Sequence, residues 1–408
     1  MHLPRKGIPR EKLFERMRAR KKEDADWRAG RTWSLVYPAG EEVDGILHEA
    51  NELYLYENAL NPFRFPSLRQ METEVVGMTA GLLNAPEAAD GAMTSGGTES
   101  ILMAVKSARE RARAERGVTR PELLAPVSAH PAFAKAAAYL DLKHIQVPLC
   151  DDYRADVNAA AKLLTENTAL MVGSAPNYPF GVIDPIPELA ALAAERGISF
   201  HTDACLGGFL LPFYERLGVN VPPFDFRVPG VTTISADVHK YGYCTKGASV
   251  IVHREAEHLR KYQLFVYRDW PGGLYGSFAM AGARPGSPIA AAWAIMMYLG
   301  EEGYLRLAQS VRETTEKLSS GIAAIPQLRV WGDPAMSVLA FGSDEVDIMA
   351  IGDVMDDRGW CLDRQTDPAA LHMMVSPEHA KVVDAFLADL LRAIQHHETS
   401  RGREARYS

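Results

Sequence analysis

Lys240 is the strongest candidate for a catalytic residue, because of its residue type and its position in the sequence. It follows the β-branched run Val231-Thr-Thr-Ile and precedes a glycine-containing turn and a second apolar run that begins at Ala248. This pattern predicts a lysine in a loop between two strands. Such a lysine is either a solvated loop residue or an amine in a partly desolvated site, neutral enough to form a Schiff base. The sequence around Lys240 does not distinguish a solvated lysine from a Schiff-base lysine, so the distinction depends on other residues of the chain.

A glycine pair at the start of a predicted helix offers a site for an anion. Ser95-Gly96-Gly97-Thr98 leads into a helix predicted over residues 99–116. Glycines let the backbone approach a ligand closely, and a helix N-terminus presents free N–H groups with a positive dipole end. Gly97 and Thr98 are therefore candidates to bind a phosphate, although the same pattern also occurs in simple turns.

Two further residues are expected at strand ends. His130 precedes a proline, where an imidazole can stack on a planar ring or serve as an ordinary surface or core histidine. Asp203 ends an apolar strand and stands before Gly207-Gly208, where it is either a turn residue or a buried carboxylate. A buried carboxylate needs a cationic partner to stay ionised, and a protonated pyridine nitrogen would supply one.

Together with Lys240, these residues match the needs of pyridoxal 5′-phosphate (PLP). That cofactor takes a lysine Schiff base, an aspartate on its ring nitrogen and donors on its phosphate. His239, next to the lysine, is a further candidate phosphate donor. No metal-binding pattern is found, and the four cysteines show no CxxC spacing, which indicates reduced thiols.

The elements that must position these residues alternate strand and helix. Seven strands are predicted, at residues 91–94, 123–129, 144–149, 169–174, 198–202, 232–235 and 248–253. Such alternation predicts an α/β fold with a mostly parallel sheet that is covered on both faces. The loops at the carboxyl ends of these strands are where such a sheet binds its ligand.

Three regions are expected along the chain. Residues 1–60 form an N-terminal arm and a helix over 41–60, residues 61–287 the large domain, and residues 288–408 a smaller α+β domain that begins with a long connecting helix. Residues 271–286 are expected to be a glycine-rich loop. The small domain should contain strands at 328–331, 338–341 and 371–375 and helices over 302–324, 346–358 and 377–396.

The composition fits a soluble globular protein. Hydrophobic residues make up 47% and charged residues 24% of 408 residues, and the net charge of −8 argues against a general nucleic-acid binder. We expect no transmembrane segment, no signal peptide and a cytoplasmic location. The first 31 residues carry eleven lysines and arginines against five acidic residues. They form either a solvated helix face or a segment that touches a phosphate-rich membrane surface.

Several stretches carry a resemblance to a known family. They are Ser95-Gly-Gly-Thr-Glu-Ser-Ile-Leu-Met-Ala, Gly181-Val-Ile-Asp-Pro, Asp203-Ala-Cys-Leu-Gly-Gly-Phe, Phe224-Asp-Phe-Arg-Val and Ser235-Ala-Asp-Val-His-Lys-Tyr-Gly-Tyr. Between about residues 37 and 375 the chain resembles the sphingosine-1-phosphate lyase family, which belongs with the group II PLP-dependent decarboxylases. The resemblance implies the PLP-dependent transferase fold of type I and a homodimer with active sites at the subunit interface.

The resemblance also implies roles for individual residues. Lys240 would form the Schiff base, Asp203 would bind the ring nitrogen and His130 would lie over the ring. The cofactor phosphate would be held by Gly97, Thr98 and His239, with Gly286 and Ser287 coming from the other subunit. Lys246 and Tyr37 match residues near the substrate. Lys246, Tyr178 or a phosphate oxygen is expected to carry the proton.

The implied reaction is cleavage of the C2–C3 bond of a phosphorylated long-chain base to a fatty aldehyde and phosphoethanolamine. Two departures bear on the substrate end: Cys244-Thr245 replaces a common Ala-Pro, and Asn61-Pro62-Phe63-Arg64 lacks the histidine of Asn-Pro-Leu-His. Two alternatives stay open, an amino-acid decarboxylase on the same fold and a non-catalytic scaffold or membrane-surface protein that kept the fold.

Overall fold

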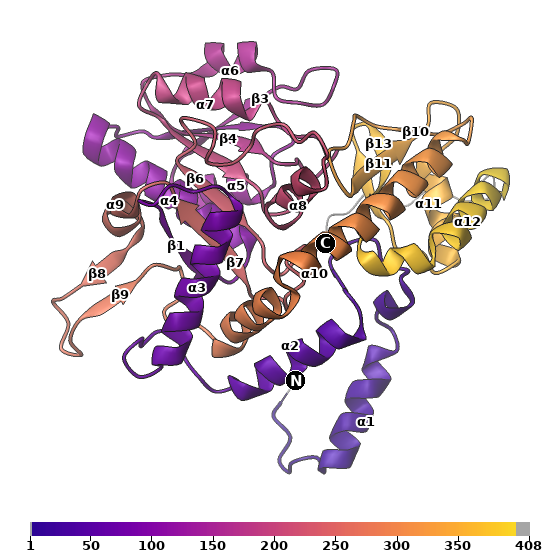
Figure 1. Ribbon diagram of the computed structural model, residues 1–408, viewed down its shortest axis with the longest axis horizontal. Coiled ribbons are helices and arrows are strands. Elements are labelled where there is room, and N and C mark those ends of the chain that lie inside the picture. Colours follow the sequence, from indigo (N-terminus) through magenta and orange to yellow (C-terminus); the bar gives the residue numbers. More distant parts are fainter. Residues whose placement is uncertain (1, 397–408) are drawn as a thin grey trace.

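The chain forms two lobes that are joined by one long helix. The computed structural model describes residues 2–396, so residues 397–408 of the predicted C-terminal domain lie outside the described part. The joining helix, α10 (Gly286–Ala323), passes from the larger lobe to the smaller one (Figure 1). Its direction breaks at Gly300, whose φ of 54° is not helical. Two helices were expected here, from about residue 288 to 299 and over 302–324, and the break at Gly300 lies between them.

A seven-stranded sheet forms the centre of the large lobe. Its strands are β1 (Asp90–Thr94), β2 (Glu122–Pro126), β3 (Lys143–Val147), β4 (Thr168–Ser174), β5 (Ser199–Asp203), β6 (Thr233–Ala236) and β7 (Ser249–His253). They are ordered β1-β7-β6-β5-β4-β2-β3. Neighbours from β3 to β6 pair in parallel, whereas β7 is antiparallel to both β6 and β1. The predicted α/β fold with a seven-stranded, mostly parallel sheet is confirmed.

The strand directions bring the carboxyl ends of six strands, all except β7, to one edge of the sheet. Because β1 and β6 are both antiparallel to β7, β1 runs in the same direction as β4, β5 and β6. Every residue of β2, β4, β5, β6 and β7 is buried, as expected for strands that are covered on both faces. The sheet is therefore a rigid support for loops that leave this edge.

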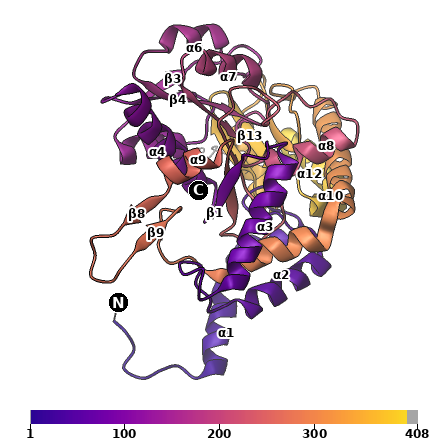
Figure 2. The same ribbon diagram turned by 60° about the vertical axis from the view of Figure 1, so that its left-hand side comes forward.

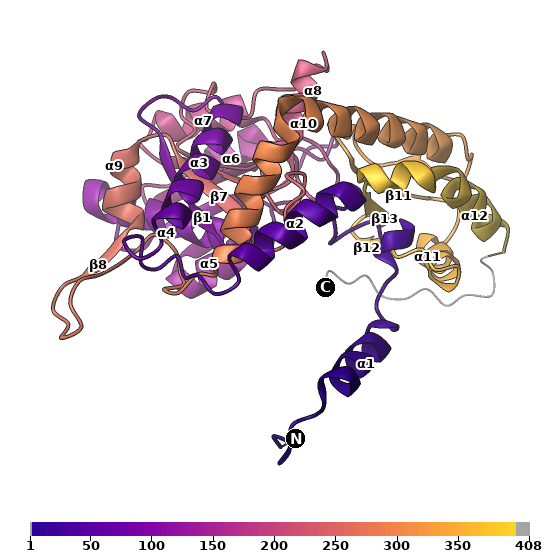
Figure 3. The same ribbon diagram turned by 60° about the horizontal axis from the view of Figure 1, so that its bottom comes forward.

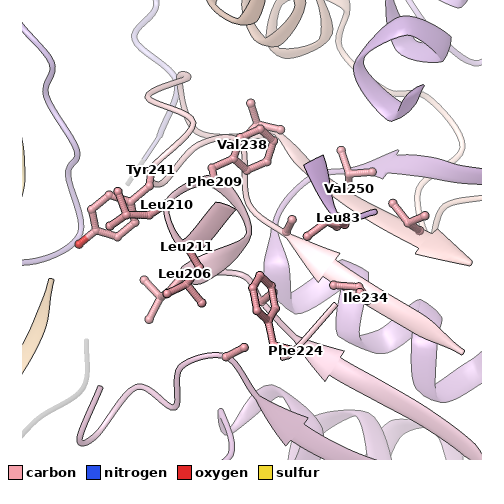
Figure 4. Packing of buried hydrophobic residues seen from close by; sticks show 14 of the residues in the cluster. Leu83, Leu206, Phe209, Leu210, Leu211, Phe224, Ile234, Val238, Tyr241 and Val250 are labelled. Carbon is pink, nitrogen blue, oxygen red and sulfur yellow. The ribbon is translucent and has the colours of Figure 1, made fainter. Parts of the chain in front are cut away.

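Helices cover the sheet and line the space next to it (Figure 1). In the large lobe they are α3 (Pro66–Leu82), α4 (Gly97–Arg116), α5 (Ala132–Leu140), α6 (Val157–Leu163), α7 (Ile186–Ala194), α8 (Leu211–Arg216), α9 (Ala256–His258) and the short turns η2 (Gly207–Phe209) and η3 (Leu259–Gln263). Figure 4 shows Phe209, Leu210 and Leu211, from the segment after β5, in the same buried cluster as Ile234 of β6, which lies next to Phe224. This buried cluster holds the backbone of β5, which ends at Asp203, and of β6, which ends four residues before Lys240.

The small lobe is an antiparallel sheet with helices packed on it. Its strands, in spatial order, are β10 (Arg329–Val330), β11 (Val338–Gly342), β13 (Ala369–Met374) and β12 (Asp363–Thr366). Its helices are α11 (Ile348–Asp357), η4 (Pro377–Lys381) and α12 (Val383–His396). The strand β12 was not predicted, because its sequence Asp-Arg-Gln-Thr has no apolar alternation.

The N-terminal segment divides between an arm and the small lobe. Helix α1 (Arg10–Lys21) buries no residue and projects from the body (Figure 3). After the turn η1 (Trp27–Ala29), Trp33 is fully buried in the core of the small lobe, with its ring stacked on His379 at 4.0 Å. Helix α2 (Glu41–Leu53) then lies along α10 (Figure 3).

Some predicted elements differ from the structure in extent or type. Helix 41–60 ends at Leu53, because the following residues turn away before the proline that was expected to stop it. Strand 123–129 ends at Pro126, so that His130 lies in the turn before α5. The segment around 271–286 contains strand β9 (Tyr275–Ser277), which pairs with β8 (Phe265–Tyr267) in a hairpin that projects from the body (Figure 2). Among residues 2–396, no helix is both long and apolar enough to cross a bilayer.

Candidate active site

A cavity of about 410 Å³ opens at the sheet edge where β1, β4, β5 and β6 end. Its wall includes residues that come from widely separated parts of the sequence: Ser95, Gly96, Gly97, Thr98, His130, Tyr178, Asp203, Asp237, His239 and Lys240. The sheet brings them together because parallel strands deliver their following loops to one edge. The volume lies within the range of small-molecule sites.

The loop after β1 forms one end of this cavity. It enters α4, whose first N–H groups have no acceptor inside the helix and can donate to an anion. A Cβ at Gly97 would lie 2.7 Å from Asp237 Oδ2 and 2.8 Å from Cys205 Sγ. Only glycine leaves this space open.

Lys240 is held by an ion pair. Its Nζ lies 3.0 Å from Asp237 Oδ2, and His239 Nε2 lies 3.5 Å from the same oxygen. Burial opposes the charge of the lysine, but the carboxylate outweighs it and raises the pKa of Lys240 well above its ordinary value. The following residue, Tyr241, is fully buried and donates to the carbonyl of Val375 at 3.0 Å, which anchors the loop in the small lobe.

Asp203 is buried at the end of β5, beneath the cavity. Its Oδ1 accepts hydrogen bonds from the Cys205 N–H at 3.0 Å and from the Ser235 hydroxyl at 3.4 Å. Its Oδ2 accepts none from the residues in the described range 2–396, so this oxygen can accept a hydrogen bond from a ligand.

The His130 ring is neutral and of defined orientation. Burial lowers the pKa of His130. Its Nδ1 accepts a hydrogen bond from the Ala132 N–H at 3.1 Å, so a neutral ring carries its proton on Nε2. A neutral imidazole held in this way is suited to packing against a planar ring.

Of the three residues predicted to lie near the substrate, Tyr178 lines the cavity, whereas Lys246 and Tyr37 lie outside its wall. The Tyr178 hydroxyl donates to Asp363 Oδ2 at 2.6 Å. The Lys246 ammonium lies 4.9 Å from the centre of the Tyr37 ring. The Lys246 Nζ also donates to the His239 carbonyl at 3.2 Å, which places it next to the Lys240 loop. Desolvation by the surrounding atoms and the neighbouring Lys240 lower the pKa of Lys246 to about 8.

Gly286 and Ser287 do not reach the cavity of their own chain. They begin α10, where the Gly286 N–H donates to the Glu57 carbonyl and the Ser287 hydroxyl donates to the carbonyls of Asn51 and Tyr54. Their predicted role required a second subunit, and it stays a prediction.

Two acidic residues of the site, Asp237 and Asp363, were not predicted from the sequence. Asp237 touches both His239 and Lys240, and its signal was its position three residues before the lysine, within the run already singled out. Asp363 comes from β12 in the small lobe, and nothing in its local sequence indicated that it would meet Tyr178.

The residues around the cavity fit PLP. The lysine can react with the aldehyde of that cofactor, and the aspartate has an oxygen free to bind the ring nitrogen. The neutral histidine ring can pack on the face of the cofactor ring. The helix N-terminus, where Gly97 leaves space, can bind the phosphate. Within residues 2–396 no group of three metal-ligating side chains competes as a cofactor site. The fold and this cavity define a PLP-dependent enzyme of fold type I.

Comparison with known proteins gives the family. The family model described as the pyridoxal-dependent decarboxylase conserved domain matches residues 26–343. A sphingosine-1-phosphate lyase of Arabidopsis thaliana is 46% identical over 401 residues, which cover 96% of this chain and 73% of the relative. A probable L-tyrosine/L-aspartate decarboxylase of Methanothermobacter thermautotrophicus is 35% identical, with 88% and 98% covered.

A solved structure agrees with these relatives. The sphingosine-1-phosphate lyase of Burkholderia pseudomallei superposes with a TM-score of 0.94 at 43% identity, covering 97% of this chain and 93% of that one. The chain belongs to the sphingosine-1-phosphate lyase family within the pyridoxal-dependent decarboxylases. It is a PLP-dependent carbon–carbon lyase, and the non-catalytic alternative is set aside.

Proposed function

We propose that this chain cleaves the C2–C3 bond of sphingosine 1-phosphate or a closely similar phosphorylated long-chain base. The products are a fatty aldehyde and phosphoethanolamine, formed by retro-aldol chemistry. One observation carries the proposal: Lys240, Asp203 and His130 converge on one cavity in a chain of the lyase family.

The chain's residues would hold the cofactor in a fixed orientation. When bound, PLP supplies an electron sink for the bond that breaks. Lys240 would carry it, while Asp203 would bind the ring nitrogen and His130 would lie against the ring. Its phosphate would be bound at the start of α4 by three residues, Gly97, Thr98 and His239.

The substrate end rests on three residues. Lys246 and Tyr37 form a cation–π pair beside the Lys240 loop, and we assign them to the phosphate of the substrate. At neutral pH the Lys246 amine is mostly protonated, since its pKa is about 8, and an ammonium attracts a phosphate dianion. Tyr178 lies in the cavity wall, where it would receive the proton of the C3 hydroxyl.

The proposal includes a homodimer in which Gly286 and Ser287 contribute to the partner's site. A groove of about 590 Å³ runs between residues 59–65 and the β8–β9 hairpin. Its surroundings expose large apolar side chains, among them Tyr56, Phe63, Trp270 and Leu274. A patch of this kind is typical of a protein–protein interface. Sedimentation at micromolar concentration should give twice the chain mass, and a monomer would contradict this part.

Two expectations about location belong to the same proposal. The exposed, basic helix α1 carries Leu13, Phe14 and Met17 on its surface, and such a helix can touch an anionic membrane that contains the lipid substrate. The four cysteines are free thiols, which fits the cytoplasm. Co-sedimentation with vesicles that contain phosphatidylserine, compared with neutral vesicles, tests the membrane contact.

The decisive experiment is product detection. Protein reconstituted with PLP is incubated with sphingosine 1-phosphate, and mass spectrometry follows hexadecenal and phosphoethanolamine in equal amounts. The Lys240→Ala variant, which should lose the visible absorbance of the lysine-bound cofactor, serves as the inactive control. Absence of both products with the wild-type protein would overturn the proposal.

A second candidate function is decarboxylation of an amino acid. The Methanothermobacter relative, named as a probable decarboxylase, favours it. This reaction would release CO₂ and an amine, so the same preparation is incubated with tyrosine, aspartate and glutamate. Amine release without aldehyde release would replace the first candidate by the second.

A further inference from the structure

A stripe of polar side chains runs along two neighbouring strands next to the cofactor cavity. Side chains at every second position of a strand share one face of the sheet, so His201 and Asp203 of β5 lie on the same face. The strand register pairs His201 with Thr233 and Asp203 with Ser235 of β6. All four residues are buried. Because buried polar groups are costly unless they are hydrogen-bonded, the stripe requires a complete hydrogen-bond pattern.

Ser235 lies at the centre of this polar stripe. Its hydroxyl oxygen is 3.0 Å from His201 Nε2, 3.2 Å from Cys205 Sγ and 3.4 Å from Asp203 Oδ1. Asp203 Oδ1 also accepts a hydrogen bond from the Cys205 N–H, so this oxygen is an acceptor. Ser235 has one proton to donate, and its contact with Asp203 is a hydrogen bond only if that proton points to Oδ1.

One arrangement of protons satisfies every contact of the polar stripe. Burial raises the pKa of Cys205 well above its ordinary value, so the thiol keeps its proton and donates to the Ser235 oxygen. Because the Ser235 proton is directed at Asp203, His201 Nε2 must carry a proton and donate to Ser235. Burial lowers the pKa of His201 to about 4, so the ring stays neutral at neutral pH. Its Nδ1 therefore accepts from the Thr233 hydroxyl at 2.9 Å.

We infer that His201 and Ser235 are positioning residues that orient the Asp203 carboxylate toward the ring nitrogen of the cofactor. The inference rests on the part of the proposed function that assigns Asp203 to that nitrogen. Two donors, the Cys205 N–H and the Ser235 hydroxyl, hold Oδ1, so the carboxylate does not turn freely about its Cβ–Cγ bond. Oδ2 is then left to accept a hydrogen bond from the ring nitrogen. His201 acts through Ser235, because the imidazole N–H directs the serine proton at Asp203.

The position of the His201 proton can be measured without cofactor or substrate. NMR of apoprotein with isotope-labelled histidine nitrogens should show a neutral His201 ring that is protonated on Nε2. The signal is assigned by its loss in His201→Gln, and it should shift in Ser235→Ala, which removes the acceptor of the Nε2 proton. A ring protonated on Nδ1 would overturn the inference, because Ser235 would then donate to His201 and not to Asp203.

Cofactor binding separates positioning from general damage to the cavity. The two probes are PLP and deaza-PLP, an analogue in which a C–H group replaces the ring nitrogen. Fluorescence titration of the apoprotein gives the dissociation constant of each. Ser235→Ala should weaken binding of PLP about fivefold and leave binding of deaza-PLP unchanged, because only PLP has a nitrogen for Asp203 to bind. Equal weakening of both probes would contradict the inference.

Thr202→Val is the matched control for the loss of a buried hydroxyl. Thr202 is fully buried on the opposite face of β5, and its hydroxyl has no hydrogen-bond partner within residues 2–396. Valine has nearly the same shape, so this variant should bind both probes as the wild-type protein does. Weaker binding of PLP alone in Thr202→Val would show that the probes do not report on the His201 face of the strand.

Two substitutions of His201 test whether it acts through Ser235. His201→Gln keeps an amide N–H that can donate to Ser235, whereas His201→Leu keeps no donor. The glutamine variant should bind PLP more tightly than the leucine variant, and equal binding would argue against His201 as a positioning residue. If His201→Leu does not fold, the proton position and the Ser235→Ala titrations still decide the question.

Failure of this inference is distinguishable from failure of the proposed function. Every measurement above uses apoprotein, PLP or deaza-PLP, and none requires turnover. A protein that shows the expected binding pattern but releases no fatty aldehyde from sphingosine 1-phosphate would contradict the proposed function alone. A protein that releases the aldehyde but carries the His201 proton on Nδ1 would contradict this inference alone.

Discussion

Lys240 Nζ lies 3.0 Å from Asp237 Oδ2, at the bottom of the cavity that fits PLP. The pair explains why a half-buried lysine is tolerated there, since an unpaired ammonium is costly to remove from water. It also means that the lysine is protonated when no cofactor is bound, whereas the attacking amine must be neutral. Asp237 therefore stabilises the site and slows its loading with cofactor at low pH.

Asp237→Asn should make cofactor uptake less dependent on high pH. In the wild-type protein the pKa of Lys240 is raised by Asp237, so the neutral amine becomes abundant only as pH rises. Removing the carboxylate charge lowers this pKa, which shifts the pH profile of the uptake rate by about 1 to 3 units toward acid. The measurement is stopped-flow absorbance after mixing apoprotein with PLP between pH 6 and 9. An unchanged profile would mean that the ion pair does not control the amine.

Gly97→Ala should weaken cofactor binding at least about tenfold. The added methyl group would press on Asp237 Oδ2 and Cys205 Sγ, and it would narrow the end of the cavity assigned to the phosphate. The dissociation constant for PLP, measured by fluorescence titration of the apoprotein, reports the effect. Gly45→Ala is the matched control, because a Cβ there meets no atom within 4 Å and its helix should gain about 0.5–1 kcal/mol.

Lys246→Met should abolish the decrease of kcat/KM at alkaline pH. The pKa of Lys246 is lowered to about 8, so the residue is an ammonium at pH 7 and mostly a neutral amine at pH 9. A ligand of the substrate phosphate must be protonated, and kcat/KM should therefore fall as pH rises through about 8. The variant should show a lower, flat value over this range, with KM rather than kcat changed. A rise with pH in the wild-type protein would instead assign Lys246 as a base.

Trp33→Ala should destabilise the small lobe by about 3–5 kcal/mol. The side chain is fully buried between His379 and Phe386, so its removal leaves a large cavity. The unfolding midpoint in urea, followed by far-UV circular dichroism, measures the change. Leu53→Ala, at a position that is 67% exposed, should shift that midpoint little, and equal shifts would argue against Trp33 as a core residue.

Most of the large lobe could be predicted from its sequence. Strands buried on both faces appear as continuous apolar runs, and all seven were predicted in the correct order along the chain. The cofactor-side residues followed from the same reasoning, because Gly97, Asp203 and Lys240 each stand directly after such a run. Polar elements were harder to predict, and β12 was missed because only its pairing with β13 makes Asp363–Thr366 a strand.

The sequence by itself predicted the residues that would hold a cofactor, and it determined that their strands end at one edge of a mostly parallel sheet. Local patterns suffice for this, since strand direction and loop position follow from the alternation of strand and helix. Only the tertiary structure decided which side chains meet. Asp363 lies 185 residues beyond Tyr178 in the chain, and Trp33 reaches the core of a lobe built from the other terminus. Such contacts depend on how the two lobes pack, which no local pattern encodes.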